Sequence, residues 1–359
     1  MLKNKMGYVI AGLIAAVLML SACGESIDDA KVSEDLEDSI EQVNAADEQE
    51  TEVIAPHQDL NQEPVPVEME RDGSDVYITM TSQITDIEIA PGEFYKAWTF
   101  NGEAPGPLIE VMEGDTIHFT MENLDPAIPH SMDFHAVHTA PDKGFADVAP
   151  NEEGTFVYPA TKPGVFMYHC GTDPILSHIA NGMHGVIIVH PEDGYPTDNE
   201  VDREYVLIQN EWYKYNDLDD MTNGEPSQVV FSSKTLNGGD QPNTNGTATA
   251  LQDEPLLAKA GDKVRFYINN VGPNEVSSFH VVGTIFDDVY IDGNPANHME
   301  GMQTVLLPAS GGVVVEFTVT EEGQYPFVTH QFNHATKGGV GVLKVTEDGL
   351  DDGAEVSGH

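Results

Sequence analysis

The chain has 359 residues, of which 15 are Lys or Arg and 61 are Asp or Glu, so its formal net charge at pH 7 is −46. A chain with this charge repels nucleic-acid phosphates and anionic lipid surfaces, which excludes nucleic acid as an expected partner. The length exceeds that of one typical domain and leaves room for two compact domains with additional segments at the ends.

The first 22 residues have the pattern of an export signal. Lys3 and Lys5 precede an apolar run that ends in Leu-Ser-Ala directly before Cys23. This pattern resembles a bacterial lipoprotein signal with its lipobox. We therefore expect a signal peptide over residues 1–22, lipid on Cys23, and an extracytoplasmic protein held at the cell surface or in the periplasm by its lipid anchor only. An uncleaved anchor helix is the alternative, but the run is slightly short of the roughly 20 residues that span a membrane.

Acidic residues are concentrated in two segments that contain no aromatic residue, at residues 23–70 and 347–359. Like charges repel one another, and such segments bury too little apolar surface to offset the entropy of ordering. We predict an acidic disordered linker over 23–70 and an acidic tail over 347–359.

The middle of the chain has the pattern of an all-β protein. From Val76 onward, short runs of β-branched and aromatic residues are separated by Gly, Pro, Asn and Asp, as in β-sandwiches. Residues 107–123 resemble residues 255–270, and the echo continues between 184–189 and 339–345. The simplest account is one sandwich fold used twice. Because Pro, Gly and Asp cluster near residue 192, we expect the first domain over 71–192 and the second over 193–346.

One of the two cysteines lies among candidate metal ligands, in the stretch MYHCGTDPILSHIANGM. If Cys23 carries lipid, Cys170 is the remaining thiol and no intrachain disulfide forms. A blue copper site uses two imidazoles, a thiolate and a weak axial thioether. Cys170, His178 and Met183 have the spacing C-x7-H-x4-M, and His130 upstream is the candidate for the fourth ligand.

Strand geometry predicts a second site. Successive side chains of a strand point to opposite faces, so His169 points away from Cys170. His135 lies an odd number of residues after His130 and points away from it if the segment is extended. A pair of outward histidines is a half-site for copper or zinc that needs a third ligand. The peptide link between His169 and Cys170 then gives a short through-bond path between the two sites.

With these residues identified, the segment from Val76 to Thr346 resembles the copper-containing nitrite reductases through the motifs PHSMDFH, KPGVFMYHC, SSFHVVG and VTHQFNHA. The resemblance implies two tandem cupredoxin-like Greek-key β-sandwich domains per chain, a homotrimer, and two coppers per chain. It implies a type 1 copper bound by His130, Cys170, His178 and Met183. It implies a catalytic type 2 copper bound by His135 and His169 of one chain and His330 of the next.

The resemblance further implies that Asp133 and His280 are catalytic and that Val282 lines the pocket. The reaction would be the dissimilatory one-electron reduction of nitrite to nitric oxide, as in denitrification or other nitrogen metabolism such as nitrate assimilation. The electron donor would be a cytochrome c or a small cupredoxin. Because the reaction consumes two protons, a carboxylate and a histidine beside the substrate form a proton relay. The metal acts as a Lewis acid on the nitrite oxygens.

The remaining histidines receive lesser roles. His334 corresponds to His178 in the repeat, but Gly339 stands where the first domain has Met183, and the second domain has no cysteine. We interpret His334 as a structural remnant. His118, His138, His184 and His190 have no place in the motifs and are expected to be strand or surface residues, with His184 a possible contact for an electron donor.

Two other functions share part of this pattern. A multicopper oxidase shares the fold but needs His-x-His pairs and a His-Cys-His triplet. Cys170 is followed by Gly171, and no two histidines lie two residues apart. The second alternative is a lipid-anchored blue-copper electron carrier without a catalytic type 2 copper. The joint presence of Asp133, His135 and His169 with His280 and His330 argues against it.

Overall fold

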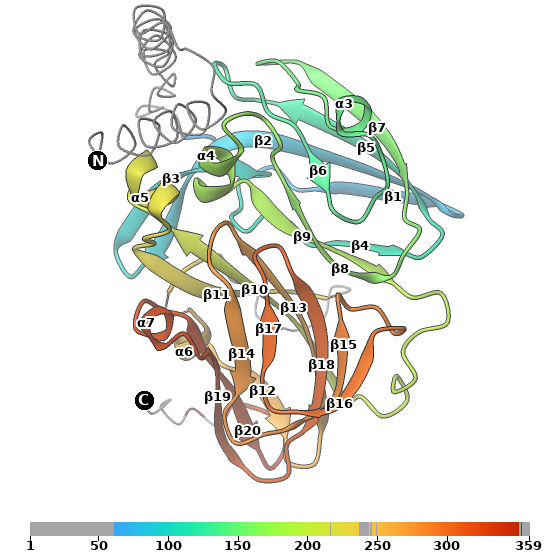
Figure 1. Cartoon of the computed structure of the whole chain (residues 1–359), viewed down its shortest axis with the longest axis vertical. Coiled ribbons are helices and arrows are strands. Elements are labelled where there is room, and N and C mark those ends of the chain that lie inside the picture. The colour runs from blue at the N-terminus through green and yellow to red at the C-terminus, as the bar shows by residue number, and fades with distance from the viewer. Residues whose placement is uncertain are drawn as a thin grey trace, which may run out of the picture. The chain divides into compact units, whose positions relative to one another are not determined.

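The structure is a computed structural model that describes residues 61–215, 217–236, 244, 246–248, 250–351 and 353. The expected signal peptide, Cys23 and the linker up to residue 60 lie outside the described residues, as does most of the acidic tail. Strands dominate the described part (Figure 1). Within it, no helix combines the length and the apolar character needed to cross a membrane.

Strands β1 to β9 build the first sandwich from two sheets. A five-stranded sheet has the order β1-β2-β5-β7 with β3 also paired to β2, and a four-stranded sheet has the order β4-β9-β8-β6. In β5, Ile117, Phe119 and Met121 alternate with more exposed residues, so one face of the strand enters the core. The strands are β1 Glu68–Asp72, β2 Asp75–Ala90, β3 Glu93–Phe100, β4 Ile109–Met112, β5 Thr116–Asn123, β6 Asp133–Phe134, β7 Glu153–Pro159, β8 Gly164–His169 and β9 His184–His190.

Strands β10 to β20 build the second sandwich. Its sheets have the orders β11-β10-β13-β18-β15-β16 and β12-β20-β19-β14-β17. Buried phenylalanines, among them Phe231, Phe266, Phe279 and Phe327, fill the space between them. The strands are β10 Arg203–Trp212, β11 Gln228–Lys234, β12 Leu256–Lys259, β13 Lys263–Gly272, β14 Ser277–Val281, β15 Phe286–Ile291, β16 His298–Met302, β17 Val305–Leu307, β18 Gly312–Thr318, β19 Gly323–Thr329 and β20 Val340–Thr346.

The internal repeat is visible in the strand pairing. The parallel pair β2 and β5 corresponds to β10 and β13, and the parallel pair β4 and β9 corresponds to β12 and β20. The prediction of an all-β chain with one sandwich fold used twice is confirmed. Short helices interrupt the strands: α3 Pro141–Gly144, α4 Ile175–Ala180, α5 Leu218–Asn223, α6 Ala250–Asp253 and α7 Phe332–Ala335.

The two sandwiches share a buried apolar layer, to which the first contributes β8 and β9 and the second β10, β13, β15 and β18. The Asn269 amide donates a hydrogen bond to the Val165 carbonyl (3.1 Å), and the Val165 N–H donates to the Asp292 carbonyl (2.8 Å). A Cβ atom on Gly312 would lie 1.9 Å from the Val165 carbonyl oxygen, so only glycine permits this approach. The strand that ends in His169 is therefore fixed against the second sandwich.

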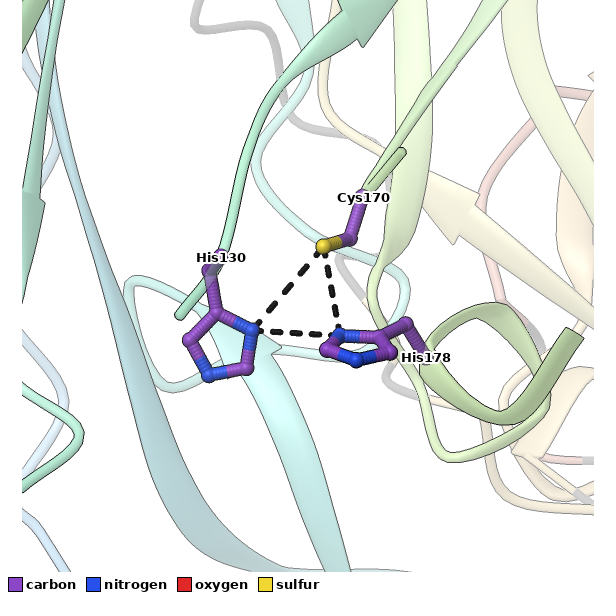
Figure 2. A group of neighbouring side chains, drawn as sticks. All are labelled: His130, Cys170 and His178. Atoms are coloured by element: carbon purple, nitrogen blue, oxygen red, sulfur yellow. Dashed lines mark hydrogen bonds between the residues drawn. The ribbon is translucent and has the colours of Figure 1, made fainter. Parts of the chain in front are cut away.

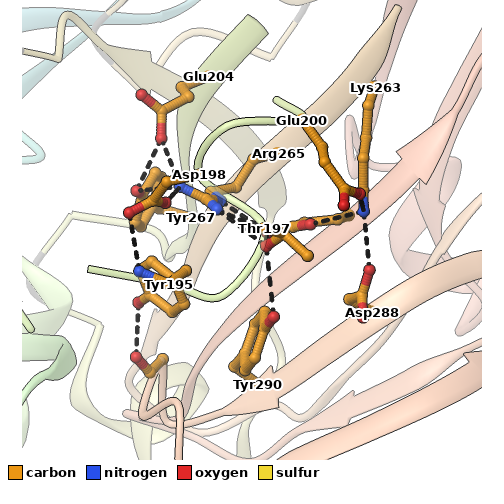
Figure 3. Close-up of polar contacts among 12 residues, drawn as sticks. Tyr195, Thr197, Asp198, Glu200, Glu204, Lys263, Arg265, Tyr267, Asp288 and Tyr290 are labelled. Carbon is orange, nitrogen blue, oxygen red and sulfur yellow. Dashed lines mark hydrogen bonds and ion pairs between the residues drawn. The ribbon is translucent and has the colours of Figure 1, made fainter. Parts of the chain in front are cut away.

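Charged side chains hold the segment between the two sandwiches (Figure 3). The Arg265 guanidinium forms ion pairs with Asp198 (2.7 Å), Glu204 (3.0 Å) and Glu316 (2.7 Å), and it lies 4.5 Å from the centre of the Tyr195 ring. Arg265 and Glu316 are buried, and a buried charge is tolerated only when paired in this way. The expected domain boundary near residue 192 lies in this segment, between β9 and β10.

The predicted linker is wrong where it overlaps the described residues. The Gln62 N–H donates to the Ile84 carbonyl (2.8 Å), the Gln83 amide donates to the Glu63 carbonyl (2.7 Å), and β1 begins at Glu68. Residues 61–70 are thus ordered because their backbone groups find partners on β2. The start of the tail is also held, since Lys344 pairs with Asp351 (2.7 Å).

Candidate metal centres

Three of the four predicted type 1 ligands converge inside the first sandwich (Figure 2). Cys170 directly follows β8, His178 lies on α4, and His130 precedes β6 in a segment whose backbone pairs with Val148. The Cys170 Sγ lies 3.2 Å from His178 Nδ1 and 3.9 Å from His130 Nδ1, and the two nitrogens are 3.2 Å apart. All three side chains are buried.

This triangle fits a metal ion. Metal–nitrogen and metal–sulfur bonds of about 2.0–2.3 Å place ligands about 3.3–4 Å apart in tetrahedral to trigonal geometry, close to the three separations found here. Two imidazoles and one thiolate are the donors of a blue copper site, and a weak axial thioether completes it. Met183 is fully buried, and its carbonyl accepts a hydrogen bond from the Cys170 N–H (3.1 Å). The structure therefore brings all four predicted residues into one region.

The surroundings of Cys170 favour the thiolate that a metal needs. Burial raises the pKa of the thiol, but hydrogen bonds and charge interactions with His130 and His178 outweigh burial and hold the pKa well below its usual range. The Ser131 backbone N–H also points at the Cys170 Sγ (3.4 Å). A thiolate is the form of cysteine that binds metal.

Asp125 is a site residue that the sequence analysis missed. It is fully buried, and its Oδ2 lies 3.3 Å from His130 Nε2, the nitrogen that faces away from Cys170. Burial lowers the pKa of His130, but the contacts with Asp125 and Cys170 outweigh burial and raise it to about 9. A carboxylate on the outer nitrogen of a ligating histidine fixes the orientation and tautomer of the ring.

A second group lies on the outer face of β6 and β8. His135 Nε2 is 3.1 Å from His169 Nε2, and Asp133 Oδ2 is 3.7 Å from the same His169 nitrogen. The His169 Nδ1–H donates to the Cys170 carbonyl (2.8 Å), so Nε2 keeps its lone pair toward His135. Burial and the neighbouring His169 lower the pKa of His135, which favours the neutral, ligating form.

The three remaining predicted residues lie on the second sandwich. His280 on β14 and His330 after β19 have ring centroids 5.2 Å apart, and Val282 is 42% exposed. The His280 Nδ1–H donates to the Gln303 carbonyl. The His330 ring also contacts Phe332, and among the described residues no contact within one chain joins His280 or His330 to His135 and His169. The first sandwich thus carries the group Asp133, His135 and His169, and the second sandwich carries a separate histidine pair, His280 and His330.

The structure corrects the expectation for His184. This residue is fully buried, and burial lowers its pKa to about 4, so it is not a surface contact for an electron donor. His118 pairs with Asp75 and His190 with Glu110, both at strand positions. His138 is exposed.

Two sandwiches with a His-Cys-His triangle define a two-domain copper protein of the cupredoxin class. Family models described as multicopper oxidase match residues 81–194 and 215–349. The copper-containing nitrite reductase of Neisseria meningitidis serogroup A is 38% identical over 297 residues, which cover 78% of this chain and 72% of the relative.

Solved structures agree with this assignment. A copper nitrite reductase from Nitrosomonas europaea has a TM-score of 0.70 and 38% identity, covering 79% of this chain and 98% of the other. A nitrite reductase from Thermus scotoductus has a TM-score of 0.70 and 36% identity, covering 76% and 62%. The chain belongs to the copper-containing nitrite reductase family.

Proposed function

We propose that the protein reduces nitrite to nitric oxide, with one electron and two protons consumed and water released. Membership of the nitrite reductase family supports the reaction. The observation that carries the proposal is the arrangement around one peptide bond. Cys170 faces the buried triangle, and the adjacent His169 faces His135 and Asp133.

The side chains fit two copper ions of different character. His130, Cys170, His178 and Met183 would hold a type 1 copper, and His135 and His169 would hold a type 2 copper together with a further histidine. When bound, the type 1 copper would supply the electron, and the type 2 copper would polarise nitrite as a Lewis acid. The backbone between His169 and Cys170 connects the two groups covalently.

Asp133 lies where a proton donor to the substrate is needed. Its carboxylate is partly exposed and lies 3.7 Å from His169 Nε2, the nitrogen that would bind the type 2 copper. Nitrite at that copper would therefore lie within reach of the carboxylate. A carboxyl group at that position can give a proton to a nitrite oxygen and regain it from solvent. Asp133 is therefore the proposed general acid. The proposed role of His280 is to hold the second proton.

The proposed third histidine comes from another copy of the chain. His330 and His280 lie on the second sandwich, away from His135 and His169 in the same chain. A closed ring of three chains would place the second sandwich of one copy against the first sandwich of the next. In that arrangement His330 completes the type 2 site, His280 joins the proton relay, and Val282 lines the pocket.

The cellular setting is part of the proposal. The lipobox before Cys23 supports export and a lipid anchor at the outer side of a membrane. A small copper protein or a cytochrome c would deliver electrons. The process served would be denitrification or a related branch of nitrogen metabolism.

A nitric oxide electrode tests the activity with copper-loaded protein, an artificial reductant and nitrite. We expect Asp133→Asn to keep both coppers and the blue colour while losing about 99% or more of nitrite turnover, a loss typical of removing a proton donor. Asp142→Asn on α3 is the matched control and should turn over nitrite normally. Unchanged turnover in Asp133→Asn would remove Asp133 from the mechanism. No turnover in fully metallated wild-type protein would favour the electron carrier.

A further inference from the structure

His184 occupies an unusual place between the two groups of candidate ligands. It is fully buried at the start of β9 and directly follows Met183. In the antiparallel pairing of β8 and β9 it lies opposite His169. Its carbonyl accepts a hydrogen bond from the Gly106 N–H (2.8 Å). The backbone of this residue is thus fixed next to both sites.

The side chain of His184 reaches the helix that carries a type 1 ligand. Its Nδ1–H donates a hydrogen bond to the Ile179 carbonyl (3.0 Å), and Ile179 directly follows His178 on α4. The last carbonyls of a helix have no partner within the helix. Because α4 has six residues, its position depends on contacts with its surroundings. The His184 contact is one of these. The Gly182 N–H also donates to the Ile179 carbonyl (3.0 Å), and the Met183 N–H donates to the His178 carbonyl (3.1 Å).

The two ring nitrogens of His184 differ in their hydrogen bonding. The His184 Nε2 is buried and has no hydrogen-bond partner among the described residues. A neutral imidazole has a single N–H, and the Ile179 carbonyl takes it. An unpaired buried acceptor costs free energy. The N–H donor at Nδ1 is therefore the part of the His184 side chain that stabilises α4.

We propose that His184 is a positioning residue for the type 1 site: its Nδ1–H holds the end of α4, and with it the His178 imidazole, in the triangle with His130 and Cys170. The inference rests on the proposed type 1 copper. His184 lies opposite His169 in the β8–β9 pairing, and among the described residues no hydrogen bond joins the two side chains. We therefore expect a change of the His184 side chain to leave the His135–His169 pair in place.

Two variants of His184 distinguish the contribution of Nδ1 from that of Nε2. In His184→Asn the side-chain amide nitrogen reaches the position of Nδ1, whereas in His184→Gln it reaches the position of Nε2. We expect His184→Asn to keep the type 1 electron paramagnetic resonance signal and the copper affinity of the wild type. We expect His184→Gln to show an altered type 1 signal and about tenfold weaker type 1 copper binding, the effect typical of losing an outer-shell contact. The type 2 signal should not change in either variant.

Titration of the apo proteins with copper against a competing chelator measures the copper affinity. Electron paramagnetic resonance of the copper-loaded proteins measures the type 1 and type 2 signals. His138→Gln, an exposed histidine, is the control. Wild-type affinity and signal in His184→Gln would overturn the inference, as would equal losses in the Asn and Gln variants. If the Gln variant does not fold, the Asn variant decides alone, because loss of the type 1 signal there contradicts the role of Nδ1. A wild-type protein without any type 1 signal would instead overturn the proposed copper site.

Discussion

Replacing Asp125 by Asn tests how the type 1 site holds His130. The Oδ1 of Asp125 accepts hydrogen bonds from the Ala127 (2.8 Å) and Ile128 (3.0 Å) N–H groups, and an asparagine carbonyl keeps both. The Oδ2 faces His130 Nε2 at 3.3 Å, and an amide NH2 there meets another donor when Nδ1 binds metal. The variant therefore preserves the local turn and removes the orienting contact from the imidazole.

The expected loss in type 1 copper affinity is ten- to hundredfold, or about 1.4–2.8 kcal/mol. The upper part of this range applies because Asp125 and His130 are both fully or almost fully buried. Titration of the apo protein with copper, followed by the thiolate-to-copper absorption band, measures the loss. Asp75→Asn breaks a similar carboxylate–imidazole pair with His118 (2.7 Å) between β2 and β5 of the five-stranded sheet and serves as the control. Equal affinities for Asp125→Asn and wild type would refute the reasoning.

Two further predictions concern assembly and acid stability. Chains with His135→Ala and chains with His330→Ala should each lose nitrite turnover, but co-expressed chains should regain part of it. Mixed trimers can pair an intact first sandwich with an intact second one, and a mixture as inactive as its components would contradict a shared site. Burial raises the pKa of Asp288, but hydrogen bonds from Lys263 and His298 outweigh burial and lower it. Because the folded-state pKa is the lower one, this stabilisation is present above about pH 4 and is lost as pH falls through the folded-state pKa. In urea at pH 7, the free energy of unfolding of Asp288→Asn should therefore be about 1–2 kcal/mol lower than that of the wild type. The difference between the two proteins should shrink at pH 3. A constant difference would show that the carboxylate charge is not involved.

Much of the fold and of the candidate sites could be predicted because both depend on local patterns. The alternation in β5 and its counterpart β13, with Gly-Asp before each strand, indicates the repeated sandwich. The parity of strand positions also predicts that Cys170 and His169 face opposite ways, and they do. Such predictions succeed where one periodicity determines which side of a strand is buried.

The residues that were missed depend on contacts made by the whole fold. Asp125 is one of 61 acidic residues, and only the packing of its loop distinguishes it from the exposed ones. The expectation for His184 is wrong because β9 is covered on both faces, by the core of the first sandwich and by the second sandwich. The continuous apolar run from Val186 to Val189 was the available signal, since strands buried on both faces do not alternate.

The central claim is that one chain provides an electron-receiving copper and its neighbour completes a nitrite-binding copper. The most direct test is the electron paramagnetic resonance spectrum of the copper-loaded protein, recorded with and without nitrite. The account predicts a type 1 and a type 2 signal, with the type 2 signal alone shifting when nitrite is added. A single type 1 signal that is indifferent to nitrite, in protein shown to be fully metallated, would contradict it.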